Sequence, residues 1–406
     1  MRQANRPNPQ LLPLPLFAAL SAPLQHRVFQ PAPTKNTRKV ILATNIAETS
    51  ITVPGILHVI DSGKHKLKQY RTVLGLESLL TKPISRSSAI QRAGRAGREA
   101  PGTCWRLYTE DGFHALDRVT RPEILRCDLA GAVLVMKARG VEDVVGFPLM
   151  DRPDREAVER ALLLLFRLGA LDENGRISEM GRRMAGMPLS PGLGRVVLEA
   201  AQVGESIVLE VVDVIAALSV ENVFLTITTE EGREAVEEKR RELFSREGDH
   251  LTLLKTVRGY AAEQTDRKAW AEKYGVSHRA MQNVMNVRKQ LRAQCKAMGL
   301  VSTVSMDDDM ESSGMSLEAK NEAILRCVLN GFAMNTARLI PDGSFRTFIG
   351  NQTVAIHPSS VLFGKKVEAI VFSEYVYTNK SYARNVSAVR LRWVEEALVG
   401  DENETS

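Results

Sequence analysis

Cysteine is scarce in this sequence of 406 residues. There are four, Cys104, Cys127, Cys295 and Cys327, and no two of them form a CxxC pair. We therefore expect neither a zinc ribbon nor a disulfide framework, and a reducing compartment fits the thiols best. The sequence also has no HExxH motif and no His/Cys cluster, so no metal site is predicted. No apolar run is long enough to predict a membrane span.

The composition is that of an ordinary globular protein, with 44% hydrophobic and 25% charged residues. The length predicts two to four domains. The net charge of +6 is unevenly placed, because residues 1–120 hold 17 Lys and Arg against 7 Asp and Glu, a balance of +10 that leaves −4 for the rest. A basic segment joined to a near-neutral body indicates a localised site for a polyanion, either a nucleic acid or a nucleotide.

The first 120 residues have the pattern of an α/β fold with parallel strands. Two apolar runs, Val40 to Leu42 and Leu57 to Ile60, predict buried strands, with a polar loop and a short helix between them. A strand pair is expected around residues 70–80, and residues 101–108 predict another core strand. Ligands of such sheets gather at the carboxyl ends of the strands.

From about residue 120 the pattern becomes helical. An apolar face formed by Val158, Ala161, Leu162, Leu165 and Leu168 is followed by Gly169, a tight turn at Asn174-Gly175 and a helix cap at Ser178. This order predicts a winged helix.

The rest of the chain predicts a helical bundle and a small barrel. Residues 192–300 are helical throughout, and in the last helix Val284, Val287, Leu291, Cys295 and Met298 form the expected buried stripe, with Arg288, Lys289, Arg292 and Lys296 elsewhere on its surface. Residues 302–316 are Ser-rich and acidic, which predicts a flexible linker. Residues 335–392 are rich in β-formers with a hairpin turn at Asp342-Gly343, which predicts the barrel.

Two motifs in the basic segment carry a family resemblance. QRAGRAGR at 91–98 places three arginines in eight residues, and TNIAETSITVPGI precedes it at 44–56. They resemble motifs VI and V of DEAH-box helicases, and RLYTEDGF, PEILRCDLA, GDHLTLL and IHPSSVLF resemble that family's C-terminal half. The last segment, with IPDGSF, is similar to a branch linked to ribosomal RNA. The resemblance runs from about Leu12 to Glu396.

The resemblance implies a multidomain architecture. We expect the second RecA-like domain, lacking its amino-terminal part, at 1–118, a winged helix at 119–190, a helical ratchet bundle at 191–301, a linker at 302–316, a β-barrel OB-fold at 317–396 and an acidic tail at 397–406. The leucine- and proline-rich start has features of a signal peptide, but Pro13 and Pro15 weaken a helix there. In the family this stretch is domain interior, so secretion is not expected.

The resemblance also implies a nucleotide site, with ATP and Mg²⁺ as cofactors. Gln91, Arg95 and Arg98 match residues that face the γ-phosphate, which suits guanidinium chemistry. Arg92 is expected to form a structural ion pair. Phe29 matches a phenylalanine that stacks on adenine, although plain core packing is its alternative, and Asp61 matches an aspartate that binds the ribose hydroxyls. Ser62 stands where the family has proline after this aspartate.

On the RNA side, the resemblance assigns Thr44, Asn45 and Thr49 to the nucleic-acid backbone, whereas helix capping is the structural alternative. A basic β-hairpin at roughly 64–84 is expected to wedge at a duplex end. In the barrel, His357, Ser359 and Lys380 match the region that touches single-stranded RNA. His250 in GDHLTLL is expected to be a packing or capping residue.

The sequence shows neither a G-x-x-x-x-G-K-[ST] loop nor an Asp-Glu-Ala-His box. ATP hydrolysis needs such a loop and acidic ligands for Mg²⁺, so we expect these in a missing upstream domain and expect this chain to be inactive alone. A sequence fragment is the simplest origin.

The motifs and domains of the sequence suggest three possible functions. The first is the C-terminal portion of an ATP-dependent RNA helicase for ribosomal RNA or pre-mRNA, nuclear or nucleolar by resemblance, with a glycine-rich-patch activator protein and no membrane. The second is a non-catalytic RNA-binding adaptor, which degraded motifs would favour, but motifs V and VI are intact. The third is a winged-helix DNA-binding protein, for which Arg182 and Arg183 offer too little basic charge.

Overall fold

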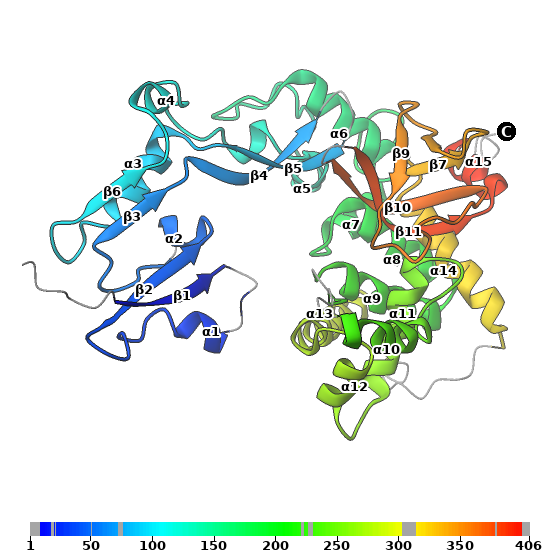
Figure 1. The fold of residues 1–406 in the computed structure, drawn as a ribbon. Coiled ribbons are helices and arrows are strands. Elements are labelled where there is room, and N and C mark those ends of the chain that lie inside the picture. The colour runs from blue at the N-terminus through cyan, green and yellow to red at the C-terminus, as the bar shows by residue number, and fades with distance from the viewer. Residues whose placement is uncertain are drawn as a thin grey trace, which may run out of the picture. The chain divides into compact units, whose positions relative to one another are not determined.

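The computed structural model describes residues 9–17, 20, 22–49, 51–71, 76–220, 223–225, 230–302, 314–377 and 380–399. The chain forms two compact units (Figure 1). The first comprises Met1–Lys68 and Leu79–Arg126, and the second comprises Gln69–Ser78 and Cys127–Ser406.

The first unit is built from short parallel strand pairs and short helices. Strands β1 and β2 pair in parallel, β3 and β6 pair in parallel, and β4 pairs with β5 as the expected hairpin, whose part within Gln69–Ser78 belongs to the second unit. The elements are β1 (Gln10–Leu16), α1 (Ala22–His26), β2 (Thr37–Ala43), α2 (Ile46–Thr49), β3 (His58–Asp61), β4 (Lys64–Arg71), β5 (Leu76–Pro83), α3 (Arg86–Gly94), β6 (Thr103–Arg106), α4 (Glu110–His114) and a 3₁₀ turn at Glu123–Leu125.

The predicted strands form, but the prediction that they are buried is wrong. Leu42 is 63% exposed, Ile60 is 70% exposed and Trp105 is 49% exposed. Ile60 is the register partner of Trp105 across the β3–β6 pair, so the two lie on the same face of that pair. Helix α3 packs on β3, whereas the face that carries Ile60 and Trp105 stays open. An apolar run gives a strand, but whether it is buried depends on what covers it.

The winged-helix prediction is confirmed in detail. Helix α6 (Arg155–Arg167) buries Val158, Ala161 and Leu165, and Gly169 follows it at φ +70°. A bridge between Leu171 and Ile177 closes the small wing around the predicted turn. The hydroxyl of Ser178 accepts the Gly181 N–H at 2.9 Å and so caps the next helix. The other helices of this part are α5 (Ala130–Ala138) and α7 (Glu179–Ala185).

The ratchet bundle follows, and its interior differs from the sequence prediction in one respect. Its helices are α8 (Pro191–Val203), α9 (Glu205–Leu218), α10 (Glu230–Arg241), α11 (Asp249–Ala262), α12 (Arg267–Lys273) and α13 (His278–Ala297). Val284, Leu291 and Cys295 are buried as expected. Arg288 and Arg292 are not surface residues, because their guanidiniums bind the buried carboxylate of Asp213 on α9 at 2.7 and 3.2 Å.

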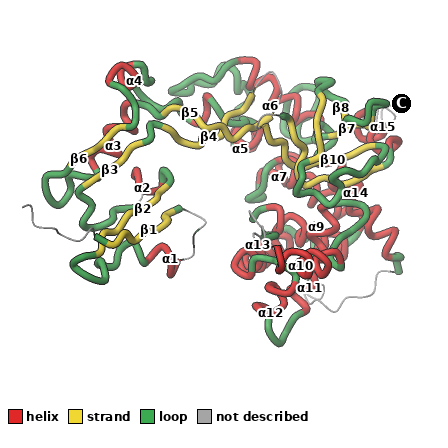
Figure 2. The backbone as a smooth tube through the Cα atoms, viewed as in Figure 1, coloured by secondary structure: helices red, strands yellow, loops and turns green. Residues whose placement is uncertain are grey.

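The last part of the chain is a closed five-stranded barrel in the order β10-β11-β9-β8-β7. Figure 2 shows its strands gathered beside the helices of the bundle. Its strands are β7 (Thr336–Leu339), β8 (Phe345–Thr347), β9 (Thr353–Ile356), β10 (Ala369–Tyr377) and β11 (Ser381–Val389), with α14 (Leu317–Gly331) before them and α15 (Leu391–Val399) after them. The barrel fills its interior with Phe345, Val354, Ile370, Phe372 and Val386.

Helix α14 packs along α8, so the segment before the barrel also belongs to the packing of the bundle. Most of the predicted linker, residues 303–313, lies outside the described residues, and so does the predicted acidic tail from residue 400. Helix α15 continues to Val399, beyond the predicted boundary at 396. The domain boundaries remain predictions. None of the described helices combines the length and apolar character needed to cross a bilayer.

Candidate nucleotide and RNA sites

The arginine motif begins on helix α3 and runs into the turn that follows. The hydroxyl of Ser85 accepts the Ser88 N–H at 3.2 Å and starts the helix. Ile90, Gln91, Gly94 and Arg98 are all exposed. At helical spacing Ile90, Gln91 and Gly94 share one face, and Arg98 extends it beyond the helix end. Arg92 and Arg95 are only partly exposed, so the motif divides into an open face and an inward face.

Arg92 forms the structural ion pair predicted from the sequence. Its Nε lies 3.0 Å from a carboxylate oxygen of Glu48, and its Nη1 lies 2.8 Å from Oδ1 of Asp61. Burial lowers the pKa of Arg92, but the hydrogen bonds to Asp61 and Glu48 outweigh this effect, so its pKa is raised. One guanidinium thus joins the motif at 91–98, the motif at 44–56 and the end of β3.

Arg95 also points toward the 44–56 motif. Its Nε donates to the carbonyl of Glu48 at 2.8 Å, its Nη2 donates to the same oxygen, and its Nη1 donates to the carbonyl of Ile51 at 3.3 Å. These carbonyls lie at the end of the short helix α2, where backbone acceptors have no partner within the helix. Burial and the charge of Arg98 lower the pKa of Arg95.

Arg98 is exposed, and its Nη1 donates to the hydroxyl of Thr52 at 2.7 Å, which is its one side-chain hydrogen bond to the residues that the structure describes. Gln91 is exposed as well, and no side-chain hydrogen bond engages it among the described residues. Of the residues assigned to the γ-phosphate, Gln91 and Arg98 therefore present their polar groups outward, whereas Arg95 is held by backbone carbonyls.

Asp61 lies at the centre of the buried network. It is 1% exposed, and its carboxylate accepts Gly63 N–H at 3.0 Å, Arg92 at 2.8 Å and the Tyr108 hydroxyl at 2.8 Å. Burial and the bond to Asp61 raise the pKa of Tyr108 to about 12. The carboxylate already accepts three hydrogen bonds and is almost fully buried, so a ribose hydroxyl could reach it only if the surrounding side chains moved. The assignment of Asp61 to the ribose remains a prediction.

Phe29 lies against the small core of Leu14, Leu16 and Val28 and is only partly buried. Its ring stands 6.2 Å from that of His26. Core packing and a face open to adenine are both compatible with this position, so its assignment to adenine remains a prediction.

The residues assigned to the RNA backbone surround helix α2. Thr44 and Asn45 precede this helix, Thr49 ends it, and all three are exposed. Their backbone carbonyls begin the turn, since Thr44 accepts Ala47 N–H at 3.3 Å and Asn45 accepts Glu48 N–H at 3.0 Å. Glu48 of the same helix binds Arg92 through its carboxylate and Arg95 through its carbonyl. The residues predicted to bind RNA therefore lie next to Arg95, which is predicted to bind the nucleotide, at this four-residue helix.

In the barrel, His357 directly follows β9. Its Nδ1 lies 2.7 Å from the hydroxyl of Ser359, and its ring meets that of Tyr382 edge-on at 5.5 Å. Burial and the charge of Arg384 lower the pKa of His357. Lys380 is exposed just before β11. Their roles in RNA binding remain predictions.

The GDH segment joins the bundle to the barrel, and sequence reasoning identified only part of it. The Asp249 carboxylate accepts the backbone N–H groups of Val361 at 2.9 Å and Val386 at 2.7 Å. His250 is a packing residue as expected, being fully buried with Nδ1 2.8 Å from the Ser387 hydroxyl. Burial lowers the pKa of His250 to about 4. Asp249 was not predicted, because its partners lie more than 100 residues further along the chain.

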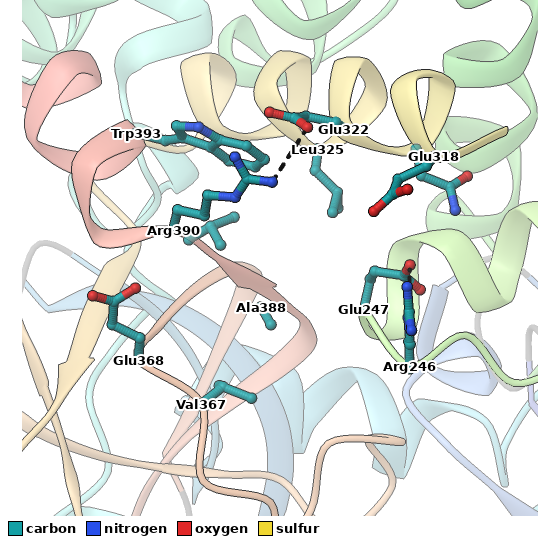
Figure 3. Close-up of a pocket in the computed structure, with 12 residues that line it drawn as sticks. Arg246, Glu247, Glu318, Glu322, Leu325, Val367, Glu368, Ala388, Arg390 and Trp393 are labelled. Atoms are coloured by element: carbon teal, nitrogen blue, oxygen red, sulfur yellow. Dashed lines mark hydrogen bonds and ion pairs between the residues drawn. The ribbon is translucent and has the colours of Figure 1, made fainter. Parts of the chain in front are cut away.

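A cleft of about 280 Å³ lies where α14 and α15 meet the barrel (Figure 3). Arg390 lies 3.5 Å from Glu322 and stacks on Trp393, with 4.8 Å from its guanidinium carbon to the ring centre. The charged residues that line the cleft are Arg246, Glu247, Glu318, Glu322, Glu368 and Arg390. Four carboxylates against two guanidiniums disfavour phosphate, so this cleft is not a candidate RNA site.

Among the residues that the structure describes, no three His, Cys, Asp or Glu side chains are grouped to hold a metal ion. The two exposed side chains predicted to face the γ-phosphate, Gln91 and Arg98, are an amide and a guanidinium, both of which can donate hydrogen bonds to an anion.

Comparison with known protein families assigns four parts of the chain. Residues 13–100 match the helicase conserved C-terminal domain, residues 161–189 the winged-helix part and residues 190–253 the ratchet-like part of the helicase associated domain, and residues 324–398 the oligonucleotide/oligosaccharide-binding fold. These matches define the chain as a set of helicase C-terminal domains and confirm the predicted fold class.

Known proteins resemble the chain over nearly its full length. It is 42% identical to the probable ATP-dependent RNA helicase DHR2 of Saccharomyces cerevisiae over 97% of this chain and 54% of that protein. It is 40% identical to human ATP-dependent RNA helicase DHX33, over 96% of this chain and 53% of that protein. It is 38% identical to the pre-mRNA-splicing factor ATP-dependent RNA helicase DEAH10 of Arabidopsis thaliana, over 95% of this chain and 54% of that protein. Over nearly its full length the chain is similar to the C-terminal domains of DEAH-box RNA helicases, and it spans about half the length of these relatives.

Proposed function

We propose that the chain supplies one side of the ATP site and part of the RNA path of an ATP-dependent RNA helicase. The observation that carries the proposal is the divided arginine motif. Gln91 and Arg98 present open polar groups, while Arg92 and Arg95 bind the segment that holds the RNA candidates. A change at the phosphate can therefore reach helix α2 through a few hydrogen bonds.

On the nucleotide side, we assign Arg98 and Gln91 to the γ-phosphate. A guanidinium stabilises the charge that develops on the transferring phosphoryl group, and a glutamine amide can orient water. The guanidinium of Arg95 must give up its hydrogen bonds to the Glu48 carbonyl to reach the phosphate. We therefore propose that Arg95 links nucleotide binding to the position of helix α2. Phe29 is proposed for adenine and Asp61 for the ribose. When bound, Mg²⁺ would neutralise phosphate charge, and we assign its ligands to the half of the relatives that this chain does not match.

On the RNA side, we assign Thr44, Asn45 and Thr49 to backbone phosphate or ribose, and His357, Ser359 and Lys380 to a single strand. Hydroxyls, amides and an ammonium are the groups that contact nucleic-acid backbones without reading sequence. We propose RNA processing, of pre-mRNA or ribosomal RNA, as the setting, a nuclear or nucleolar location and a glycine-rich-patch protein as activator. The names of the relatives and the family resemblance support this setting.

The test is RNA-stimulated ATP hydrolysis. It is measured for the chain alone and for a polypeptide in which the unmatched half of a relative precedes the chain. We expect hydrolysis only by the longer polypeptide, and we expect Arg98→Ala to lower its rate about a thousandfold. Arg118→Ala is the matched control, because Arg118 is an exposed arginine of the same unit outside the motif.

A different result would favour the adaptor function. If the chain alone binds single-stranded RNA tightly, and Arg98→Ala leaves hydrolysis by the longer polypeptide unchanged, then the arginines do not act on ATP. The chain would then be an RNA-binding module.

A further inference from the structure

The connection from β9 to β10 runs from His357 to the exposed Glu368, and its residues 357–366 form a loop of successive turns on the barrel. Ser360 N–H donates to the His357 carbonyl at 2.9 Å, Phe363 N–H to the Ser360 carbonyl at 3.1 Å and Lys365 N–H to the Leu362 carbonyl at 3.0 Å. The second turn begins where the first ends, and the third overlaps the second by two residues. The backbone of this loop is therefore defined by its own hydrogen bonds, although it belongs to no helix or strand.

The loop is also held from both sides. Its start donates from His357 N–H to the carbonyl of Ala383 on β11 at 2.9 Å. Its middle donates from Val361 N–H to Asp249 of the bundle at 2.9 Å, and Leu362 is fully buried in the barrel core. A loop anchored by a buried leucine and by a carboxylate of a neighbouring helix presents its remaining side chains in fixed positions, which lowers the entropic cost of binding.

The side chains that the loop presents are aromatic and basic. Phe363 is 57% exposed although its neighbour Leu362 is fully buried. Lys365 and Lys366 are exposed, and no acidic side chain pairs with either among the described residues. Residues 357–366 contain no Asp or Glu. An exposed phenylalanine beside unpaired lysines matches the two components of single-strand binding, a stacking surface for a base and cations for the backbone.

We infer that Phe363 stacks on an unpaired base of single-stranded RNA while Lys365 and Lys366 bind the neighbouring phosphates. This inference rests on the proposed function and adds a base-stacking residue to it. The closed five-stranded barrel has a fold that binds oligonucleotides mainly through its second and third strands and the loops after its first and fourth strands, and residues 357–366, between its third and fourth strands, would add a contact outside that face. The acidic cleft beside α15 has the opposite charge, so phosphate is directed to the loop rather than to the cleft.

The test is binding of a fluorescently labelled oligouridine to the full chain at several salt concentrations. Phe363→Ala should weaken binding about tenfold or more and leave the salt dependence unchanged, because stacking involves no ion release. Lys365→Ala with Lys366→Ala should weaken binding and lower the slope of log affinity against log salt by about 0.7 per lysine. Phe363→Trp should retain binding, which separates stacking from loss of fold.

Two matched controls accompany these variants. Phe166→Ala removes a phenylalanine that is 45% exposed on α6, and Lys268→Ala with Lys273→Ala removes two exposed lysines of α12. The inference is overturned if wild-type chain binds the oligouridine and Phe363→Ala binds within twofold of it, or if the controls lose as much affinity. If wild-type chain does not bind the RNA, the proposed function fails together with the inference. If Phe363→Ala weakens binding but the longer polypeptide hydrolyses no ATP, the inference stands and the helicase proposal fails.

Discussion

The guanidinium of Arg92 lies 2.8 Å from Oδ1 of Asp61, whose side chain is fully buried. Arg92 belongs to the arginine motif and Asp61 to the end of a strand 31 residues earlier. The same guanidinium reaches Glu48 at 3.0 Å. Three segments of the first unit therefore share one cation, and its removal would leave a buried carboxylate without its charge partner.

The first prediction follows from this ion pair. Arg92→Ala should lower the free energy of unfolding of the first unit by about 3 kcal/mol, because it leaves the carboxylate of Asp61 buried without a compensating positive charge. Urea unfolding can be followed by the fluorescence of Trp105, which lies in this unit. Arg98→Ala is the control, since its single exposed contact with Thr52 should change stability by less than about 0.5 kcal/mol. Equal losses in the two variants would show that Arg92 has no special structural role.

Much of this site could be predicted from the sequence, because its elements are local. The spacing within 91–98 identified the motif, and Asn174-Gly175 with Ser178 identified the turn and cap of the winged helix, whereas the ion pair of Arg92 was expected from the family resemblance. These signals depend on residues a few positions apart, where backbone preferences decide the structure.

The errors concern contacts between distant segments. Ile60 and Trp105 have the apolar character of core strands, but their burial depends on whatever covers that face. Arg292 has the polarity of a surface residue, but Asp213, 79 residues earlier, allows it to be buried. Asp249 meets its barrel partners across 112 and 137 residues. Periodicity within one element contains no information about such partners.

The second prediction concerns Gly63, which has φ +69° and lies under the ring of Tyr108. A β-carbon there would come within 2.6 Å of that ring, so alanine must displace the tyrosine that donates to Asp61. Gly63→Ala should lower the free energy of unfolding by about 2 to 3 kcal/mol. Gly55→Ala is the matched control, because Gly55 has φ +75° with nothing near its β-position, and it should cost only about 1 kcal/mol. Denaturation curves that coincide would contradict the steric argument.

The third prediction concerns the buried cluster of Asp213, Arg288 and Arg292. Asp213→Ala removes the buried carboxylate that two largely buried guanidiniums bind, and it should lower stability by about 3 to 5 kcal/mol. Glu156→Ala removes the exposed partner of Arg160 and should cost less than about 0.5 kcal/mol. Replacing all three members of the cluster with Leu and Met should recover most of the loss, as measured by thermal unfolding. Failure of this triple change to recover stability would mean that the cluster contributes more than charge pairing.

The fourth prediction concerns pH. His250 is fully buried between the bundle and the barrel, and its pKa is lowered from 6.5 to about 4. The folded state therefore holds the neutral imidazole, whereas the unfolded chain gains a proton as the pH falls through 6.5. The stability that depends on neutral His250 is complete above pH 6.5 and is lost progressively as the pH falls toward 4.

Between pH 7 and pH 5 this linkage should lower the free energy of unfolding of the second unit by about 2 kcal/mol. Urea unfolding at the two pH values, followed by the fluorescence of Trp270 and Trp393, measures this change in free energy. In His250→Asn the dependence should be reduced by this amount, because the amide oxygen can take the Ser387 contact and does not titrate. His114→Asn is the control, since its side chain is 62% exposed and should leave the dependence unchanged. If the pH dependence in His250→Asn is unchanged, protonation of this imidazole does not contribute to the pH dependence of unfolding of the second unit.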